Sequence, residues 1–308
     1  MNTLKFSKKS LLSTEQHNPD VHLEKTIKIA NNNLKISIPT NLNIFITNKC
    51  NAKCFFCINH NYTNQDIDDE LYYKSLNKTL EELDPNYFEI TITGGEPTIN
   101  KERFVKTLEI CNQKGFKFRT ISTNGLNLLS KYKGKELCNY LVENNAIHNI
   151  NISRMCIDSN KEIMKAKTLS NEEIKKLANY FYMHDAEMRI SCNLINGYVD
   201  NMDKILEFVD YYRSIDVPTI MFRELVGEEN QPIINEVFKP DKDFKKIDHS
   251  SDDIYEIDIY EYKDYIVKHY IQKKEIKNET INNLALRNGM LSINFNKRII
   301  KDFRKENI

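Results

Sequence analysis

The stretch "LNIFITNKCNAKCFFCINH" (residues 42–60) organises the interpretation of the whole chain. Its first six residues, 42–47, are mostly β-branched, aromatic or other apolar residues, which is typical of a buried strand. Three of the chain's seven cysteines follow at once, as Cys50, Cys54 and Cys57. A strand that leads directly into a loop crowded with thiols predicts a site at the carboxyl end of that strand.

The chain beyond this stretch alternates between short apolar runs and longer segments with apolar residues at helical spacing. Five further runs read as strands, at 87–93, 116–123, 147–153, 187–195 and 217–225. Helices are predicted between the strands, near 69–83, 101–114, 134–144, 170–183 and 201–214. Because right-handed crossovers set consecutive strands side by side and parallel, the pattern predicts an α/β fold with helices outside a twisted sheet, open or curled into a barrel.

Two β-rich segments flank this alternating core. Before it, "TIKIANNNLKISIP" (26–39) predicts a β-hairpin that turns at 31–33. After it, the Tyr- and Ile-rich segment 253–272 and "GMLSINFN" near the end predict further strands. We therefore expect an N-terminal segment with a hairpin over 1–41, a core over 42–225 and a C-terminal β-rich extension over 226–308.

The bulk composition gives no signal of a charged partner. Lys plus Arg equals Asp plus Glu at 44 each, so no charge excess signals a nucleic acid or an anionic membrane. No apolar run approaches the length of a membrane span, and the N-terminus lacks the features of a secretory signal. We expect a cytoplasmic protein, in which clustered cysteines bind metal or do chemistry more often than they form disulfides.

The spacing C-x3-C-x2-C leaves two kinds of metal site open. A zinc module needs four ligands, and no second C-x2-C occurs, so His60 would have to serve as the fourth. The thiolates can instead ligate an iron–sulfur cluster, in which three cysteines leave one of four irons open to a small molecule.

The motif C-x3-C-x-aromatic-C, with Phe56 as the aromatic residue, resembles the radical S-adenosylmethionine (radical SAM) family. The exit of the second strand, "TITGGEPT" (91–98), resembles the second motif of the same family. The resemblance implies that the three cysteines hold a [4Fe-4S] cluster, that SAM binds its open iron, and that Phe56 lies beside the adenine. It also implies that the loop of Gly94, Gly95, Glu96 and Pro97 receives the amino group of SAM.

Later strand exits supply further cofactor-binding candidates. The third strand ends in "STNG", where Ser122 and Asn124 can bond a ligand. The resemblance gives Ser153 a ribose contact, Arg154 a contact to the SAM carboxylate, and Asn193 a place near the adenine. Ordinary polar residues at strand ends are the alternative for these last three positions.

Two further residues are candidates for the reaction itself. Cys156, just beyond the fourth strand, is a candidate hydrogen donor, with burial in the loop as the alternative. Arg223, at the end of the sixth strand, is a candidate for substrate contact, with a strand-end ion pair as the alternative. No cysteine follows Cys192, so the resemblance implies a core without a C-terminal auxiliary-cluster (SPASM) domain.

The resemblance implies a partial (β/α)6 TIM-like barrel and a radical mechanism. A low-potential donor, flavodoxin or ferredoxin, would reduce the cluster, and cleavage of SAM would give a 5′-deoxyadenosyl radical that abstracts hydrogen from a small metabolite or a peptide. The polar loop 58–69 and the C-terminal extension are candidate covers for the barrel mouth. A non-catalytic iron–sulfur protein for electron transfer or redox sensing, and a zinc-binding interaction module, remain as alternatives.

Overall fold

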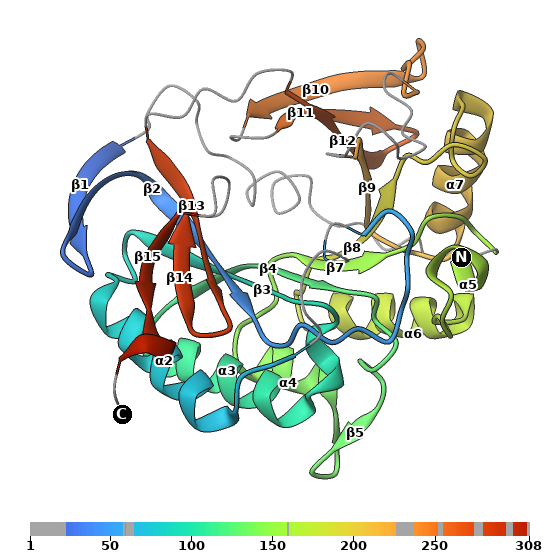
Figure 1. The fold of residues 1–308 in the computed structure, drawn as a ribbon. Helices are drawn as coiled ribbons and strands as arrows, with labels where there is room; N and C mark the ends of the chain where they lie inside the picture. The colour runs from blue at the N-terminus through green and yellow to red at the C-terminus, as the bar shows by residue number, and fades with distance from the viewer. Residues whose placement is uncertain are drawn as a thin grey trace.

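A long curved sheet organises the chain, with the helices packed along one face of it (Figure 1). The computed structural model describes residues 23–57, 59, 65–158, 160–225, 237–251, 255–273, 280–293 and 298–306. Residues 1–22 of the expected N-terminal segment, and residues 58 and 60–64 of the candidate cover 58–69, therefore lie outside the described residues. Within the helices of the described part, none is long and apolar enough to cross a membrane.

The six predicted strands are confirmed and lie side by side in chain order. They are β2 (Asn32–Phe45), β3 (Phe88–Thr93), β4 (Lys117–Thr123), β7 (Ile150–Ser153), β8 (Met188–Asn193) and β9 (Thr219–Arg223). Every neighbouring pair among them is parallel. The predicted partial (β/α)6 TIM-like barrel is thus confirmed.

The five predicted helices are also present, each within a few residues of its expected ends. They are α2 (Asp69–Glu82), α3 (Lys101–Gln113), α4 (Leu137–Glu143), α6 (Asn171–Tyr182) and α7 (Met202–Ser214). Ser170 and Glu173 form a capping box at the start of α6. Short elements were not predicted: η2 (Pro97–Ile99), the pair β5 (Lys131–Tyr132) and β6 (Lys135–Glu136), and α5 (Asn160–Met164).

The N-terminal hairpin is present, but its turn differs from the prediction. β1 (Leu23–Ile29) pairs with the first half of β2, and Ile29 stands opposite Asn32. The turn is therefore Ala30–Asn31, with φ of 46° and 67°, rather than 31–33. A two-residue turn needs left-handed backbone at both positions, which Asn tolerates well. β2 then runs on without a break into the barrel, so hairpin arm and first barrel strand are one element.

The C-terminal segment is β-rich as expected and extends the barrel sheet at both edges. Its elements are β10 (Phe244–Ser251), β11 (Tyr255–Tyr262), β12 (Tyr265–Gln272), β13 (Ile281–Arg287), β14 (Met290–Ile293), β15 (Ile299–Asp302) and η3 (Phe303–Lys305). β12 pairs in parallel with β9, and β13 pairs in parallel with β2. In Figure 1 the orange and red strands accordingly flank the core on opposite sides.

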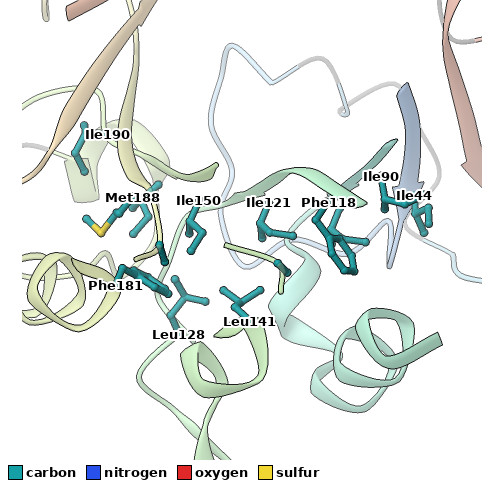
Figure 2. Close-up of a cluster of buried hydrophobic side chains, with 14 of the residues drawn as sticks. Ile44, Ile90, Phe118, Ile121, Leu128, Leu141, Ile150, Phe181, Met188 and Ile190 are labelled. Carbon is teal, nitrogen blue, oxygen red and sulfur yellow. The ribbon is translucent and has the colours of Figure 1, made fainter. Parts of the chain in front are cut away.

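The main apolar core lies between the sheet and the helices. Figure 2 shows apolar side chains of successive strands meeting side chains of the helix layer, among them Leu141 and Phe181. The strand residues drawn there include Ile44, Ile90, Ile121, Ile150 and Ile190. Since side chains alternate between the two faces of a strand, the neighbours of these residues point to the barrel interior. Those neighbours are mostly polar: Asn43, Thr91, Ser122, Asn151 and Ser191.

Candidate functional site

The cysteine loop follows β2 at the carboxyl edge of the parallel strands and is tied down on several sides. Thr47 Oγ1 and Asn48 N donate to the Asp66 carboxylate at 2.5 and 2.6 Å. Farther along, Lys53 N donates to Met164 O at 2.7 Å. The loop therefore has a defined course between the exit of β2 and α5.

The three cysteines of this loop are free thiols that lie near one another. Burial, followed by the neighbouring Cys57 and Cys50, raises the pKa of Cys54 to about 12. A metal bound here must therefore displace a thiol proton. In the described ranges, no three His, Cys, Asp or Glu side chains stand close enough to hold a single metal ion. In an iron–sulfur cluster each thiolate binds a separate iron, whereas a zinc site gathers its four ligands on one ion.

The two glycines of the GGEP loop bring that loop against the cysteine loop. Gly95 N donates to Thr47 O, and Glu96 N donates to Lys49 O, both at 2.8 Å. A Cβ at Gly94 would lie 2.5 Å from Thr47 O, and one at Gly95 would lie 2.2 Å from Lys49 O. The resemblance implies that this loop meets the amino group of SAM. In the structure, the groups that the two glycines admit are backbone atoms of the cysteine loop.

The Glu96 carboxylate is engaged by the protein itself. Only 1% of the residue is exposed. The carboxylate accepts hydrogen bonds from Thr98 N and Oγ1 at 3.1 and 2.5 Å, from Thr123 Oγ1 at 2.6 Å and from Asn124 N at 2.7 Å. Burial raises the pKa of Glu96, and these bonds oppose the rise. In this conformation the carboxylate is not free to bind an ammonium group, because it already joins the exits of β3 and β4. Pro97 begins η2, directly after this joint.

The third strand exit contacts the cysteine loop through Asn124. Its Nδ2 donates to Asn51 Oδ1 at 2.7 Å. Ser122, two residues earlier, is partly exposed, and its register partner is Asn151 of the interior face. Thr123 lies between them on the buried side and bonds Glu96. The sequence did not indicate that Thr123 would bond Glu96, although strand alternation places Thr123 on the opposite face from Ser122.

Arg154 does not lie where the resemblance implied. Its guanidinium is buried on the helix side of the sheet, with 3% of the residue exposed. It donates to Tyr212 Oη, Leu169 O, Ile157 O and Asn171 Oδ1 at 2.8 to 3.1 Å. The physical reason is the two-residue period of a strand: Ser153 has the interior register partner Ser191, so Arg154 points the other way. The contact expected between Arg154 and a carboxylate in the barrel is thus wrong.

Phe56 and Cys156 belong to one small apolar cluster beneath the cysteine loop. Phe56 is 7% exposed and packs with residues from the exits of β7, β8 and β9 and from α5: Met155, Ile195, Leu225 and Ile163. Cys54 and Cys156 pack against the same cluster. The structure thus brings the candidate donor Cys156 to the cysteine loop. Asn193 is partly exposed at the exit of β8, opposite Arg223 of β9.

A residue of the C-terminal segment that the sequence did not indicate also holds the site. Arg287, at the end of β13, donates from Nε to Asn48 Oδ1 at 2.7 Å and from Nη1 to Asn59 Oδ1 at 3.2 Å. Asn59 Nδ2 in turn donates to Gly94 O at 3.1 Å. One guanidinium therefore links the start and end of the cysteine loop, and Asn59 extends the link to the GGEP loop.

Comparison with known families identifies this arrangement. The protein-family model described as "Radical SAM superfamily" matches residues 44–212, which is more than half of the chain. The chain belongs to the radical SAM superfamily. Members of this superfamily bind a [4Fe-4S] cluster and SAM, and the three clustered thiols fit such a cluster.

Curated relatives of this radical SAM chain include GTP 3′,8-cyclases. The mitochondrial enzyme of Arabidopsis thaliana is 25% identical over 193 residues, which cover 61% of this chain and 47% of the relative. The enzyme of Helicobacter pylori is 27% identical over 191 residues, which cover 59% of this chain and 56% of the relative. The alignments thus span about half the length of these relatives. Together with the family match they identify an enzyme, so the two non-catalytic alternatives are no longer needed.

Solved structures similar to this radical SAM chain include Streptococcus suis SuiB bound to S-adenosylmethionine. The identity is 22% and the TM-score 0.49, with 66% of this chain and 45% of that chain covered. Methylornithine synthase is similar at 12% identity and a TM-score of 0.41, with 62% and 55% covered.

Proposed function

We propose that Cys50, Cys54 and Cys57 hold a [4Fe-4S] cluster and that this enzyme cleaves SAM reductively to take a hydrogen atom from a small metabolite or a peptide. The observation that carries the proposal is the joining of two loops: the GGEP loop is hydrogen-bonded, backbone to backbone, to the loop that gathers the three thiols. When bound, the cluster and SAM supply a one-electron cleavage that leaves a carbon radical able to remove hydrogen.

The residues of the chain have three tasks in this proposal. The thiolates bind iron after losing their protons, and the bonds from Arg287 and Asp66 hold the loop in place. The main chain of 94–97, rather than the Glu96 carboxylate, is left to meet the amino group of SAM. The barrel interior, lined by the polar neighbours of the core residues, orients the substrate and limits access of water.

Reconstitution of the cluster tests whether the three thiolates bind iron. Protein reconstituted anaerobically with iron and sulfide should bind both, and Cys54→Ser should lose most of each, because one iron loses its thiolate. Cys111→Ala is the matched control, since Cys111 is fully buried in α3 among core residues. It should lower stability without lowering iron content. Equal iron in the wild type and in Cys54→Ser would refute the ligand assignment.

Cleavage of SAM tests the activity. Reconstituted wild-type protein with dithionite and SAM should release methionine and 5′-deoxyadenosine, measured by liquid chromatography with mass spectrometry. Reduced flavodoxin or ferredoxin should replace dithionite as the electron donor. A cluster-loaded protein that binds SAM and yields no 5′-deoxyadenosine with any of these reductants would contradict the proposed function.

GTP is one specific substrate candidate, because the curated relatives are named GTP 3′,8-cyclases. If GTP is the substrate, its addition should accelerate formation of 5′-deoxyadenosine and give a product of unchanged mass and altered retention. If GTP leaves the rate unchanged, the general proposal stands and the substrate is another small molecule or a peptide.

A further inference from the structure

Arg223, the last residue of β9, faces the barrel interior at the carboxyl edge of the sheet. Its neighbour Phe222 points toward the helices, where its ring lies 5.6 Å from the ring of Phe208 on α7. Strand alternation therefore directs Arg223 the other way. Its register partners are Asn193 of β8 and Tyr270 of β12. Arg223 thus lies where the barrel core and the C-terminal strands meet.

Two tyrosines from the C-terminal strands lie against the Arg223 guanidinium. The guanidinium carbon is 5.4 Å from the ring centre of Tyr255 on β11 and 5.3 Å from that of Tyr270 on β12. The two ring centres are 5.6 Å apart. Three nearly equal distances place both rings on one side of the cation. The opposite side of the guanidinium is not covered by either ring.

The surroundings of the partly exposed Arg223 differ from those of the buried arginines. Arg103 bonds the Asp69 carboxylate and two backbone carbonyls, Arg189 bonds the Glu187 carboxylate, and Arg154 bonds four oxygen atoms. Arg223 has a Met221 sulfur 3.7 Å from Nη2, and its buried Nε has no hydrogen-bond partner. Among the described residues its contacts are this sulfur and the two rings, and none is a carboxylate.

This combination is costly unless a ligand completes it. Although Arg223 as a whole is partly exposed, its Nε–H is buried without an acceptor, and an unpaired buried donor is destabilising. Tyrosine faces attract the cation and hold it in place, but they accept no conventional hydrogen bond from its N–H groups. The planar fork of a guanidinium matches the paired oxygens of a carboxylate or a phosphate.

We propose that Arg223 binds an anionic oxygen group, a carboxylate or a phosphate, on the substrate of this enzyme. Tyr255 and Tyr270 hold the guanidinium, and Asn193 beside it supplies a neutral hydrogen-bonding group. The chain continues from Arg223 to Leu225, which packs against Phe56 of the cysteine loop. The exit of β9 that follows Arg223 therefore reaches the cysteine loop. The inference rests on the proposed function, whose substrate class it specifies.

SAM also carries a carboxylate, but strand order favours the substrate. Four strands, β8, β7, β4 and β3, separate β9 from β2, whose exit leads into the cysteine loop. The methionine part of SAM belongs at that loop in the proposed function. Arg223, on the opposite flank of the core, is placed to hold a second molecule.

Anaerobic calorimetric titration of the reconstituted protein tests the proposal with three probes: benzoate, phenyl phosphate and the uncharged benzamide. Benzoate, phenyl phosphate or both should bind the wild type, and benzamide should bind at least about tenfold more weakly. In Arg223→Gln the dissociation constant of the bound anion should rise at least about tenfold. Arg223→Lys should give an intermediate dissociation constant, because lysine keeps the positive charge but lacks the paired N–H groups of the guanidinium. Which anion binds more tightly distinguishes a carboxylate-bearing from a phosphate-bearing substrate.

Control variants test whether anion binding depends on the Arg223 guanidinium and on the rings beside it. Arg213→Gln removes an exposed arginine of α7 and should leave anion binding unchanged. Tyr255→Phe keeps the aromatic ring and should also leave anion binding unchanged. Tyr255→Leu removes the ring and should weaken anion binding. SAM affinity should change less than about twofold in Arg223→Gln. Circular dichroism of each variant checks folding.

The outcomes assign failure to one proposal or the other. With the wild type, the inference is overturned if neither anion binds, or if benzamide binds as tightly as the anions. With folded Arg223→Gln, it is overturned if the variant binds the anions as tightly as the wild type does, or if the variant loses SAM affinity together with anion affinity. Release of 5′-deoxyadenosine from SAM alone should persist in the control Arg213→Gln. If the wild type itself releases none, it is the proposed function that fails.

Discussion

At the residue scale, burial decides what several ionisable side chains can do, and His269 of β12 is a clear case. It is almost fully buried and packs against the ring of Phe238 at 4.7 Å between ring centres. Burial lowers its pKa from 6.5 to about 4. Glu224 Oε1 lies 3.7 Å from Nε2, too far for a hydrogen bond, so the carboxylate offsets little of this effect.

The lowered pKa of His269 predicts how stability depends on pH. In the unfolded chain His269 takes up its proton near pH 6.5, before the folded chain does. The free energy of unfolding is therefore unaffected by this histidine above about pH 6.5 and decreases as the pH falls from about 6.5 to about 4. The total loss from this one group is at most roughly 3 kcal/mol. Urea unfolding at a series of pH values should show this decline, and a folded His269→Leu variant should show less of it. Parallel pH profiles for the two proteins would contradict the assignment.

Individual residues differ in how far the sequence predicts them. The thiols of Cys50, Cys54 and Cys57 could be assigned to one site because their spacing alone keeps them in one loop. Arg154 could not, because a shift of one residue in a strand reverses the face on which the side chain lies. Glu96 lies in the loop after β3, but its carboxylate accepts hydrogen bonds from Thr98, Thr123 and Asn124, whose convergence depends on the neighbouring strand.

At the scale of elements, the contact between the cysteine loop and the GGEP loop is the joint on which the site depends. We predict that Gly95→Ala separates these loops, because the new methyl group would lie 2.2 Å from Lys49 O. Iron content after reconstitution should fall severalfold while circular dichroism stays close to that of the wild type.

Gly115→Ala is the matched control for Gly95→Ala. A Cβ at Gly115, which has φ of 80°, would meet nothing within 4 Å. This control should lose about 1 kcal/mol of stability from backbone strain alone and keep its iron. Full iron content in Gly95→Ala would show that the loops can part without loss of the site.

The repeating strands and helices were predictable because two different periods, two and about 3.6 residues, alternate along the chain. The boundaries that failed are those set by contacts. β2 continues through Pro39 because β3 and β13 pair along its second half. The short helix α5 supports the cysteine loop through Met164 and leaves little trace in five residues of sequence.

At the scale of the whole molecule, the C-terminal strands belong to the barrel sheet. Residues near 254–271 show the alternation of strands, but a sequence pattern does not name the strand with which each will pair. The structure assigns β12 to β9 and β13 to β2, at opposite edges of the core. Arg287 and Tyr270 reach the candidate site for this reason, so side chains more than 200 residues beyond Cys50 take part in it.

Hydrogen exchange should reveal this arrangement. Because β12 and β13 are paired on both sides, we expect their amides to be protected about as strongly as those of β9 and β2. The amides of the outer strands β10 and β15 should exchange faster, since each is paired on one side only within the described sheet. Mass spectrometry of peptic fragments after deuterium labelling measures both. Rapid exchange throughout residues 265–287 would show that the segment is only loosely attached.

The order of these strands in the chain also bears on biosynthesis. As the polypeptide leaves the ribosome, β2 to β9 emerge before the strands that cover their two outer edges. Within the described sheet, one side of β9 lacks its partner until β12 has emerged, at residue 272, and one side of the second half of β2 lacks its partner until β13 has emerged, at residue 287. Such bare edges pair readily with neighbouring nascent chains. Slow or interrupted translation after residue 225 should therefore favour aggregation more than a pause earlier in the chain.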